Sequence, residues 1–100
     1  MKNGYKVVWT NKALANLDNI IQYLTDNWTE KDMAAFFRKL DKRINIISQH
    51  PLLYPLTNNR ENVRRSVLTS QITIYYRIDN LSVEILTLFD NRQNPSKLIV

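Results

Sequence analysis

The 100-residue sequence contains no cysteine and a single glycine, Gly4. Without cysteine, the chain can have neither a disulfide framework nor a thiolate metal site, which fits a cytoplasmic protein. A single glycine excludes, in practice, a glycine-rich phosphate-binding loop. Only one histidine, His50, is present, and no metal-ligand spacing or Ser-His-Asp set occurs. We therefore expect no metal site and no cofactor.

Long hydrophobic runs are also missing. The N-terminal residues contain none, which argues against a transmembrane helix and against a secretory signal. We therefore expect a cytoplasmic protein with no membrane partner. The 44% hydrophobic content is enough for one core of ordinary size, so the sequence predicts a single domain over residues 1–100, with a loosely ordered tail after about residue 95.

Positive charge is what the chain has in excess: 14 lysines and arginines against nine acidic residues give a net charge of +5. This favours an acidic partner such as a nucleic acid, a ribosome or an acidic polypeptide. The first half carries six lysines and two arginines, and the second half five arginines and one lysine. Because the planar arginine side chain suits two-point contact with phosphate or carboxylate, we expect the site in the second half.

Residues 62–95 contain runs of β-branched and aromatic side chains. Two short polar pairs, Thr69-Ser70 and Asp79-Asn80, divide this stretch. The pattern predicts antiparallel strands at about 62–68, 71–78 and 82–89, joined by tight hairpins.

Two-residue loops at both polar pairs define the strand registers. Val67 then faces Ile72, and Tyr76 faces Val83. Since side chains alternate along a strand, one face becomes apolar and needs a covering layer. Its residues are Val63, Val67, Ile72, Ile74, Tyr76, Ile78, Val83 and Ile85. The polar face, which remains open for a partner, collects Arg64, Ser66, Thr73, Tyr75, Arg77 and Glu84.

The first half supplies the covering layer. Residues 5–9 form a short apolar strand candidate, and Thr10 can cap the helix that follows. Thr29 and Asp32 approximate a capping box for a second helix, which Pro51 ends. Apolar residues recur at helical spacing in the first helix at Leu14, Leu17, Ile21, Leu24 and Trp28. The fold class is therefore α+β, with order β-α-α-β-β-β and a helical hairpin packed on an antiparallel sheet.

Four segments in this order resemble the RelE/ParE superfamily of bacterial toxins from type II toxin–antitoxin systems. They are YKVVWTNKALANLDNIIQYL, Gln49-His50-Pro51, VRRSVLTSQITIYYRI and FDNRQNPSKL. The resemblance covers roughly residues 5 to 98. It implies a RelE/ParE-like domain and one of two activities. RelE-like members are ribosome-dependent endoribonucleases that cleave messenger RNA, whereas ParE-like members poison DNA gyrase without established catalytic residues. Both kinds are silenced by an antitoxin whose C-terminal segment wraps the toxin.

The family's functional residues carry over only in part. Arg77 and Arg92 match arginines of the ribonuclease pattern, but Thr73 stands where those members often have a catalytic arginine. Residues 96–98, Ser-Lys-Leu, replace the late tyrosine or histidine. His50 matches a structural His-Pro at a helix end. RNA cleavage needs groups that accept and return a proton, so these departures weaken the ribonuclease interpretation.

The candidate binding residues for a target or a nucleic acid are Arg64, Tyr75, Arg77, Glu84 and Arg92. The alternative is that Arg64 and Arg77 merely pair with Glu84 and shield the sheet. Glu84 opposite Tyr75 could be an acid–base pair or, more simply, a salt-bridge partner. We expect Arg65 on the core face, extending its charged end to solvent.

A second group of basic residues lies in the second helix: Arg38, Lys39, Lys42 and Arg43. These side chains could bind nucleic acid or only solvate the outer face of the helix.

The sequence therefore predicts the toxin of a type II toxin–antitoxin pair, closer to ParE than to RelE, that inhibits DNA gyrase by binding. The alternative is a ribosome-dependent endoribonuclease with a reduced active site, which leaves its status as an enzyme open. A third hypothesis is a non-toxic binding module of the same fold. The expected partners are a cognate acidic antitoxin and either DNA gyrase or a ribosome with messenger RNA.

Overall fold

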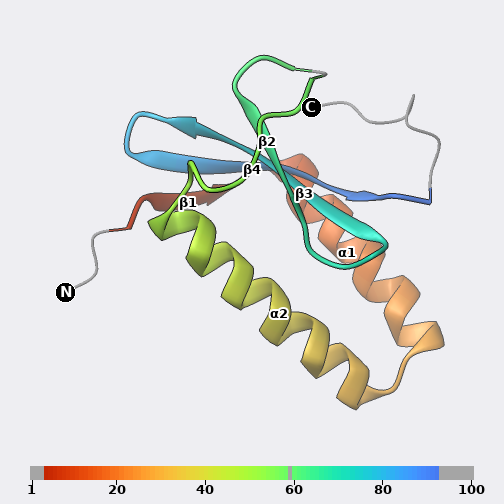
Figure 1. Cartoon of the computed structure of the whole chain (residues 1–100). Helices are drawn as coiled ribbons and strands as arrows, with labels where there is room; N and C mark the ends of the chain where they lie inside the picture. Colours follow the sequence, from red (N-terminus) through yellow and green to blue (C-terminus); the bar gives the residue numbers. More distant parts are fainter. Residues whose placement is uncertain (1–3, 59, 93–100) are drawn as a thin grey trace.

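Two helices and four strands follow one another in the predicted order in the computed structural model, which describes residues 4–58 and 60–92 (Figure 1). Both helices cover the same face of the sheet, so the predicted two-layer α+β architecture is confirmed. The elements are β1 (Lys6–Trp9), α1 (Asn11–Asn27), α2 (Glu30–Gln49), β2 (Val63–Val67), β3 (Ile72–Asp79) and β4 (Ser82–Asp90). The predicted loose tail after about residue 95 lies outside the described residues.

The strand order in the sheet is β1-β4-β3-β2. β2, β3 and β4 are antiparallel neighbours, as predicted. β1, however, runs parallel to β4, with Val7 opposite Val83 and Trp9 opposite Ile85. The sheet is therefore mixed rather than purely antiparallel. The four residues of β1 contain no local signal for its direction. Whether β1 is parallel or antiparallel depends on which strand it pairs with, and the packing of the other elements decides that partner.

Both helices begin at the predicted caps. The Thr10 hydroxyl accepts a hydrogen bond from the amide of Ala13, and Thr29 with Asp32 forms a reciprocal capping box. The two helices are joined by Trp28 and Thr29 alone, which forces them to run back antiparallel. At the end of α2, the backbone N–H of His50 donates to the carbonyl of Ile46, so His50 is helix-end structure, as the sequence indicated.

The core lies between the helices and the sheet. Its fully buried members from the helices include Ala13, Leu24, Phe36, Leu40 and Ile47. The strands contribute Leu68, Ile72, Ile74, Tyr76, Val83, Ile85 and Leu88. The predicted stripe of α1 is only partly confirmed, because Leu14 is exposed and Ala13 takes the buried position. Trp28, expected in the core, is partly exposed at the end of α1, where its ring meets Phe36 edge-on.

The β3–β4 hairpin turns at Asn80 and Leu81 rather than at Asp79 and Asn80, because Asp79 already pairs with Ser82. Asn80 has a φ of 57°, a left-handed conformation that asparagine tolerates better than most residues. From Tyr76 to Asp79 the register therefore differs by two residues from the predicted one. A shift of two keeps the side chains of this part on their predicted faces, so Arg77 and Glu84 do share the face away from the helices.

The β2–β3 connection corrects a larger error. Its loop has three residues rather than two, since Leu68 donates its N–H to the carbonyl of Ile72. The hydroxyl of Thr69 accepts hydrogen bonds from the amides of Gln71 and Ile72 and so stabilises this longer loop. The extra residue shifts the register of β2 by one, which moves every side chain of β2 to the face opposite the predicted one.

The observed pairs are Arg64 with Tyr76 and Arg65 with Tyr75. Arg64 is therefore on the helix-covered side of the sheet and Arg65 on the open side, the reverse of the expectation for both. Val67, predicted for the core, is exposed.

Residues 51–57 run along the outer edge of β2. The amide of Arg65 donates to the carbonyl of Pro55, and the amide of Thr57 donates to the carbonyl of Val63. Deeper in the fold, the buried hydroxyl of Tyr76 donates to the carbonyl of Pro51 at 2.6 Å. Burial raises the pKa of this phenol to about 12, against the opposing effect of the Arg64 charge. This segment thus protects one sheet edge; Pro51 is buried and Tyr54 packs against the core, while the leucines of the segment are exposed.

Among the residues that the structure describes, neither helix is long and apolar enough to cross a membrane.

Candidate functional site

The arginines that the sequence groups together are separated in the structure into three environments. Arg64 is partly buried on the helix-covered side, where its guanidinium donates to the carbonyl of Tyr54 at 2.7 Å. This contact ties the 51–57 segment to β2. Arg64 is therefore a structural residue, and the expectation that it shares an outward surface with Arg77 is wrong.

Arg43 in α2 has a similar structural role. Its guanidinium donates to the hydroxyl of Ser66 at 2.8 Å and to the carbonyl of Val67 at 2.6 Å, and it lies over the ring of Tyr54. Unlike the exposed Arg38, Lys39 and Lys42, it joins the helix to the edge strand and does not merely solvate an outer face.

The open side of the sheet is the second environment. Arg77 and Glu84, opposite each other on β3 and β4, form an ion pair at 2.5 Å between Nε and Oε1. The ordinary salt-bridge role of Glu84 is therefore the observed one, and this contact raises the pKa of Arg77. Arg65 is exposed on the same side, opposite Tyr75.

This open side offers less free surface than predicted. Tyr75 and Thr73 are only 8% and 3% exposed. The hydroxyl of Thr73 donates to the side-chain oxygen of Asn91, just beyond β4. The charged groups on this side include Arg65 and the Arg77–Glu84 pair. They also include the exposed Asp79, whose charge helps to raise the pKa of Arg77.

Arg92 occupies the third environment, at the opposite end of the hairpin. Its ion-pair partner, Asp90, lies opposite Ile72 at the start of β3. Ile72 precedes Arg77 by five residues, which is about 17 Å along the strand. Arg92, one of the predicted binding residues, therefore does not share a surface with Arg77. The two residues lie at opposite ends of β3 because the hairpin carries Arg92 away from the turn.

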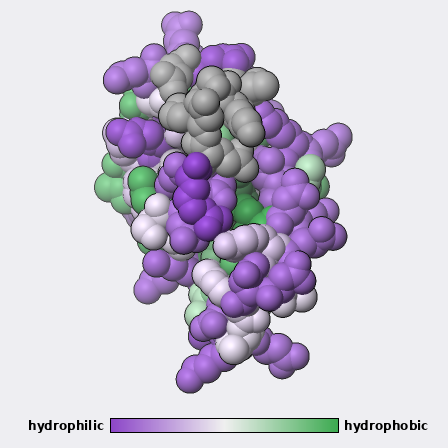
Figure 2. All heavy atoms as spheres, turned by 90° about the vertical axis from the view of Figure 1, so that its right-hand side faces the viewer, coloured by the Kyte–Doolittle hydropathy of each residue, from purple (hydrophilic) through white to green (hydrophobic). Residues whose placement is uncertain are grey.

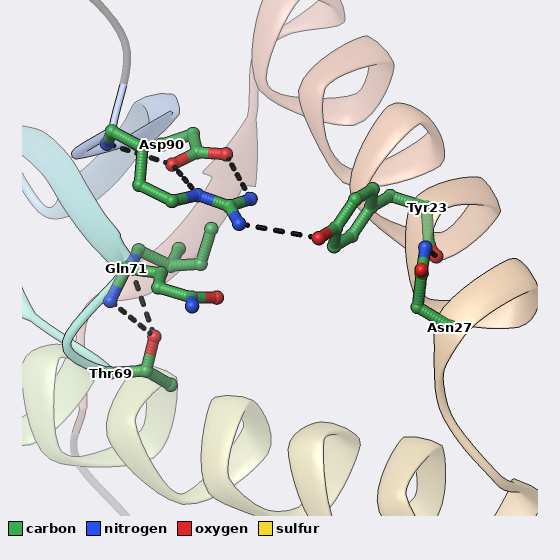
Figure 3. Close-up of polar contacts among 7 residues, drawn as sticks. Tyr23, Asn27, Thr69, Gln71 and Asp90 are labelled. Carbon is green, nitrogen blue, oxygen red and sulfur yellow. Dashed lines mark hydrogen bonds and ion pairs between the residues drawn. The ribbon is translucent and has the colours of Figure 1, made fainter.

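The Arg92 guanidinium is fixed by two side chains (Figure 3). It donates to both carboxylate oxygens of Asp90, at 3.0 and 2.7 Å, and to the hydroxyl of Tyr23 at 3.3 Å. It also lies 5.0 Å from the centre of the Tyr23 ring, and its backbone N–H donates to Asp90. The hydrogen bonds from Arg92 lower the pKa of the Asp90 carboxyl below its ordinary value.

Asp90, Tyr23 and Arg92 stand at the rim of a groove with a cavity of about 310 Å³. The groove lies between α1, the β2–β3 loop, the end of β4 and the first turns of α2 (Figure 3). Its apolar floor consists of Ile20, Leu24, Phe36, Ile72 and Leu88. The polar rim includes Lys12, Asn19, Tyr23, Gln71, Asp90 and Arg92. Figure 2, which views this side of the molecule, shows hydrophobic atoms near the middle of the face, surrounded by hydrophilic residues.

The groove continues into a second hollow over the start of α2. Trp28, Phe36 and Thr69 line both hollows, and the second adds Ala35 and Lys39. Together they make an extended, two-part surface with an apolar floor, a shape suited to a peptide segment.

No pattern in the sequence marked Tyr23 as a groove residue, since it lies outside the apolar stripe of α1. Its position one helical turn from Ile20 and Asn27 was the only hint of a shared side of the helix. The position of Asp90 two residues before Arg92 was a better clue to an ion pair. The two side chains meet because the chain turns after β4.

The described residues 4–58 and 60–92 contain no group of three or more histidine, cysteine, aspartate or glutamate side chains that could hold a metal ion. Nor do they bring His50 to either charged site: it ends α2, beside Tyr5 and Pro51.

Sequence comparison agrees with this architecture. Residues 7–95 match the family model described as the ParE toxin of the type II toxin–antitoxin system, parDE. The chain is also similar to Toxin ParE1 of Caulobacter vibrioides, with 30% identity over 86 residues, covering 85% of this chain and 88% of that protein.

Solved structures extend the likeness in fold. A chromosomal ParDE toxin–antitoxin system from P. aeruginosa superposes with a TM-score of 0.74 at 16% identity, over 89% of this chain and 98% of the other. The E. coli DinJ-YafQ toxin–antitoxin complex gives 0.61 at 7% identity, over 89% and 94%. The YoeB dimer from Staphylococcus aureus gives 0.58 at 12% identity, over 85% and 94%. Because the family model matches residues 7–95, which is most of the chain, this chain belongs to the ParE toxins of type II toxin–antitoxin systems.

Proposed function

We propose that this toxin arrests growth by binding DNA gyrase and that a cognate acidic antitoxin neutralises it. The match to the ParE family over residues 7–95 carries the proposal. Gyrase is the target that the family resemblance implies. The net charge of +5 supports an acidic partner for neutralisation.

The state of the residues that match the ribonuclease pattern also supports binding rather than chemistry. Thr73, which stands in place of a catalytic arginine, is buried and bonded to Asn91. Arg77 is paired with Glu84 at one end of β3, and Arg92 with Asp90 at the other. Within the described residues, these groups do not converge on a point where a ribose 2′-hydroxyl could lose its proton.

We assign gyrase contact to the open side of the sheet, through Arg65 and Arg77 with Tyr75 and Glu84 beside them. Arg65 has no strong partner on that side among the described contacts, and Arg77 has one carboxylate. Two arginines there could make two-point contacts with carboxylates or phosphates of the target.

The test is to add the purified toxin to a gyrase supercoiling assay and, separately, to a reconstituted translation reaction. We expect loss of supercoiling and no ribosome-dependent cleavage of messenger RNA. Mapped cuts in the messenger RNA together with unaffected gyrase would overturn the proposal in favour of the endoribonuclease. Absence of both effects, from a protein that also leaves growth unaffected, would identify a non-toxic binding module.

A further inference from the structure

The proposed gyrase surface on the open side of the sheet has charged groups but little exposed apolar area. Arg65, Arg77 and Glu84 lie on this side, whereas Thr73 and Tyr75 of the same side are only 3% and 8% exposed. Specific protein interfaces usually combine a polar rim with an apolar centre and bury about 800 Å² on each partner. The open side supplies the rim, so an apolar centre has to come from a neighbouring part of the molecule.

The end of the molecule next to this side carries the three most exposed large hydrophobic residues among those that the structure describes. Leu81 in the β3–β4 turn is 79% exposed, and Leu52 and Leu53 after α2 are 68% and 63% exposed. The β3–β4 turn, the start of β1 and the end of α2 lie together at this end (Figure 1). A single exposed leucine is ordinary on a protein surface, but a group of them marks a site of association. These three leucines are called the apolar end below.

The start of β1 joins the two parts of the apolar end. The amide of Lys6 donates to the carbonyl of Leu81 at 3.0 Å. Its neighbour Tyr5 lines a hollow together with Leu52 and Leu53. Two consecutive residues therefore contact the turn on one side and the segment after α2 on the other, which makes the leucines parts of one surface.

Hydrogen bonds hold the backbone of the apolar end in place. The amide of Tyr5 donates to the carbonyl of Ser48 at 2.8 Å, and the Ser48 hydroxyl donates to the carbonyl of Tyr5 at 2.8 Å. The buried hydroxyl of Tyr76 donates to the carbonyl of Pro51, directly before Leu52. Because this backbone is already fixed, a partner that covers the leucines orders little additional chain.

The apolar end adjoins the charged groups of the open side. Arg77 precedes Asn80, the first residue of the turn, by three residues, or about 10 Å along the strand. The exposed Asp79 and Lys6 both pair with Ser82 beside the turn, from opposite sides of β4. One partner surface can therefore cover the apolar end and reach these charged groups at the same time.

We propose that the apolar end is the buried centre of the gyrase contact and that the charged groups around Arg77 form its rim. Leu81 enters an apolar recess of gyrase, and Leu52 and Leu53 pack beside it. Arg65 and Arg77 meet anionic groups at the edge of the same contact. The inference rests on the proposed gyrase binding and adds the apolar side chains that this binding uses.

The experiment measures the affinity of the full toxin for purified gyrase in the absence of DNA. The variants are Leu81→Ala and the double substitution Leu52→Ala with Leu53→Ala. The matched control is Leu14→Ala, which shortens a 46% exposed leucine of α1 outside the apolar end. Since each change removes most of an apolar side chain, we expect about tenfold weaker binding for Leu81→Ala and for the double variant, and less than about twofold for Leu14→Ala.

A direct test of contact accompanies the affinities. Toxin that carries the photoreactive residue p-benzoylphenylalanine at position 81 should form a covalent adduct with a gyrase subunit on irradiation, whereas the same residue at position 14 should not. Thermal unfolding shows whether each alanine variant keeps its fold, and the adduct from position 81 tests the contact even where an alanine variant is unstable. Sedimentation of the unaltered toxin shows whether a second copy covers the leucines.

The outcomes separate this inference from the proposed function. Unchanged gyrase affinity in Leu81→Ala and in the double variant, or no adduct from position 81, would overturn the inference and leave gyrase binding in place. A toxin dimer that Leu81→Ala converts to a monomer, with unchanged gyrase affinity, would assign the apolar end to a second copy of the chain. If the unaltered toxin does not bind gyrase, the proposed function fails, and the inference fails with it.

Discussion

The two ends of the β3–β4 hairpin each present an arginine–carboxylate pair, and the pairs are nearly alike in exposure. Arg77 and Arg92 are 48% and 47% exposed, and their partners Glu84 and Asp90 are 24% and 21%. Their surroundings differ. Arg77 makes one bond across two strands on the open side of the sheet, whereas Arg92 is held by both oxygens of Asp90 and by Tyr23, above an apolar cavity.

The difference shows that an ion pair by itself says little about function. Surface pairs of either kind contribute about 0–1 kcal/mol to stability. What distinguishes Arg92 is the groove that α1 and α2 complete beside it. Under the proposed function, the open side of the sheet is the candidate surface for gyrase, and the groove beside Arg92 is a separate surface.

The largest expected effect comes from the double substitution Arg65→Ala and Arg77→Ala. If both arginines contact gyrase, each loss costs about tenfold in affinity, so the double variant should bind gyrase about a hundredfold more weakly. Antitoxin affinity should change by less than about twofold. The measurement is gyrase inhibition and antitoxin titration on the same preparations. The matched control is Arg38→Ala with Lys42→Ala, which removes the same charge from exposed positions of α2. Parallel losses toward both partners would show that the two ends are one site.

The next effect separates the neighbours Arg64 and Arg65, which lie on opposite faces of β2. Arg64→Ala should lower the free energy of unfolding by about 1.5 kcal/mol, because the partly buried carbonyl of Tyr54 loses its charged donor. Arg65→Ala should stay within about 0.5 kcal/mol, as exposed substitutions usually do. Chemical denaturation of the two variants measures this. If Arg65→Ala lowered the free energy of unfolding more than Arg64→Ala, the predicted register, which places Arg64 on the open face, would be supported instead.

Tyr76 provides a third test of which face is buried. Removing its hydroxyl in Tyr76→Phe leaves the Pro51 carbonyl unpaired and should cost about 1 kcal/mol at neutral pH. Because the folded state raises the phenol pKa from 10.0 to about 12, the stability due to this group is complete below pH 10 and is lost as the pH rises toward 12. Unfolding curves between pH 8 and 12 should show a steeper alkaline loss for the unaltered protein than for Tyr76→Phe. Identical slopes would contradict the burial of the phenol.

The smallest expected effect is the loss of stability in acid that the Arg92–Asp90 pair at the groove causes. Arg92 lowers the pKa of Asp90 from its ordinary value of 3.8, so the pair stabilises the fold above about pH 4, and this contribution is lost as the pH falls through the lowered pKa. Arg92→Ala should therefore reduce stability slightly at pH 7, and the difference should shrink as Asp90 becomes protonated in acid. A difference that does not change with pH would mean that Arg92 acts through packing against Tyr23 instead.

Local signals in the sequence were reliable for the elements themselves. The Thr10 cap, the Thr29–Asp32 capping box and the stop before Pro51 define both helices through contacts within a few residues, and the structure contains each of them. The alternation of apolar residues in β3 likewise predicted that Ile72, Ile74 and Tyr76 are buried.

The candidate site was harder to predict because it depended on loop lengths. One extra residue in the Thr69–Gln71 loop reversed the faces of Arg64 and Arg65, and the two-residue shift at Asn80 made Arg77, not Tyr75, the partner of Glu84. The bulge between Tyr75 and Tyr76 also escaped prediction, since it inserts Leu86 without any turn residue to mark it. Tyr23 was missed because its distant partner, Arg92, is joined to it only by the tertiary fold.

The amino-acid sequence by itself determined the order of elements, the helix limits, the basic character and the family, because each depends on composition or on contacts between residues close in the chain. The tertiary structure alone decided the parallel pairing of β1, the face on which each β2 arginine lies, and the groove that joins Tyr23, Phe36 and Arg92. The reason is that residues 69 positions apart, such as Tyr23 and Arg92, meet only when the helices have packed on the sheet. No local pattern encodes the distance between them.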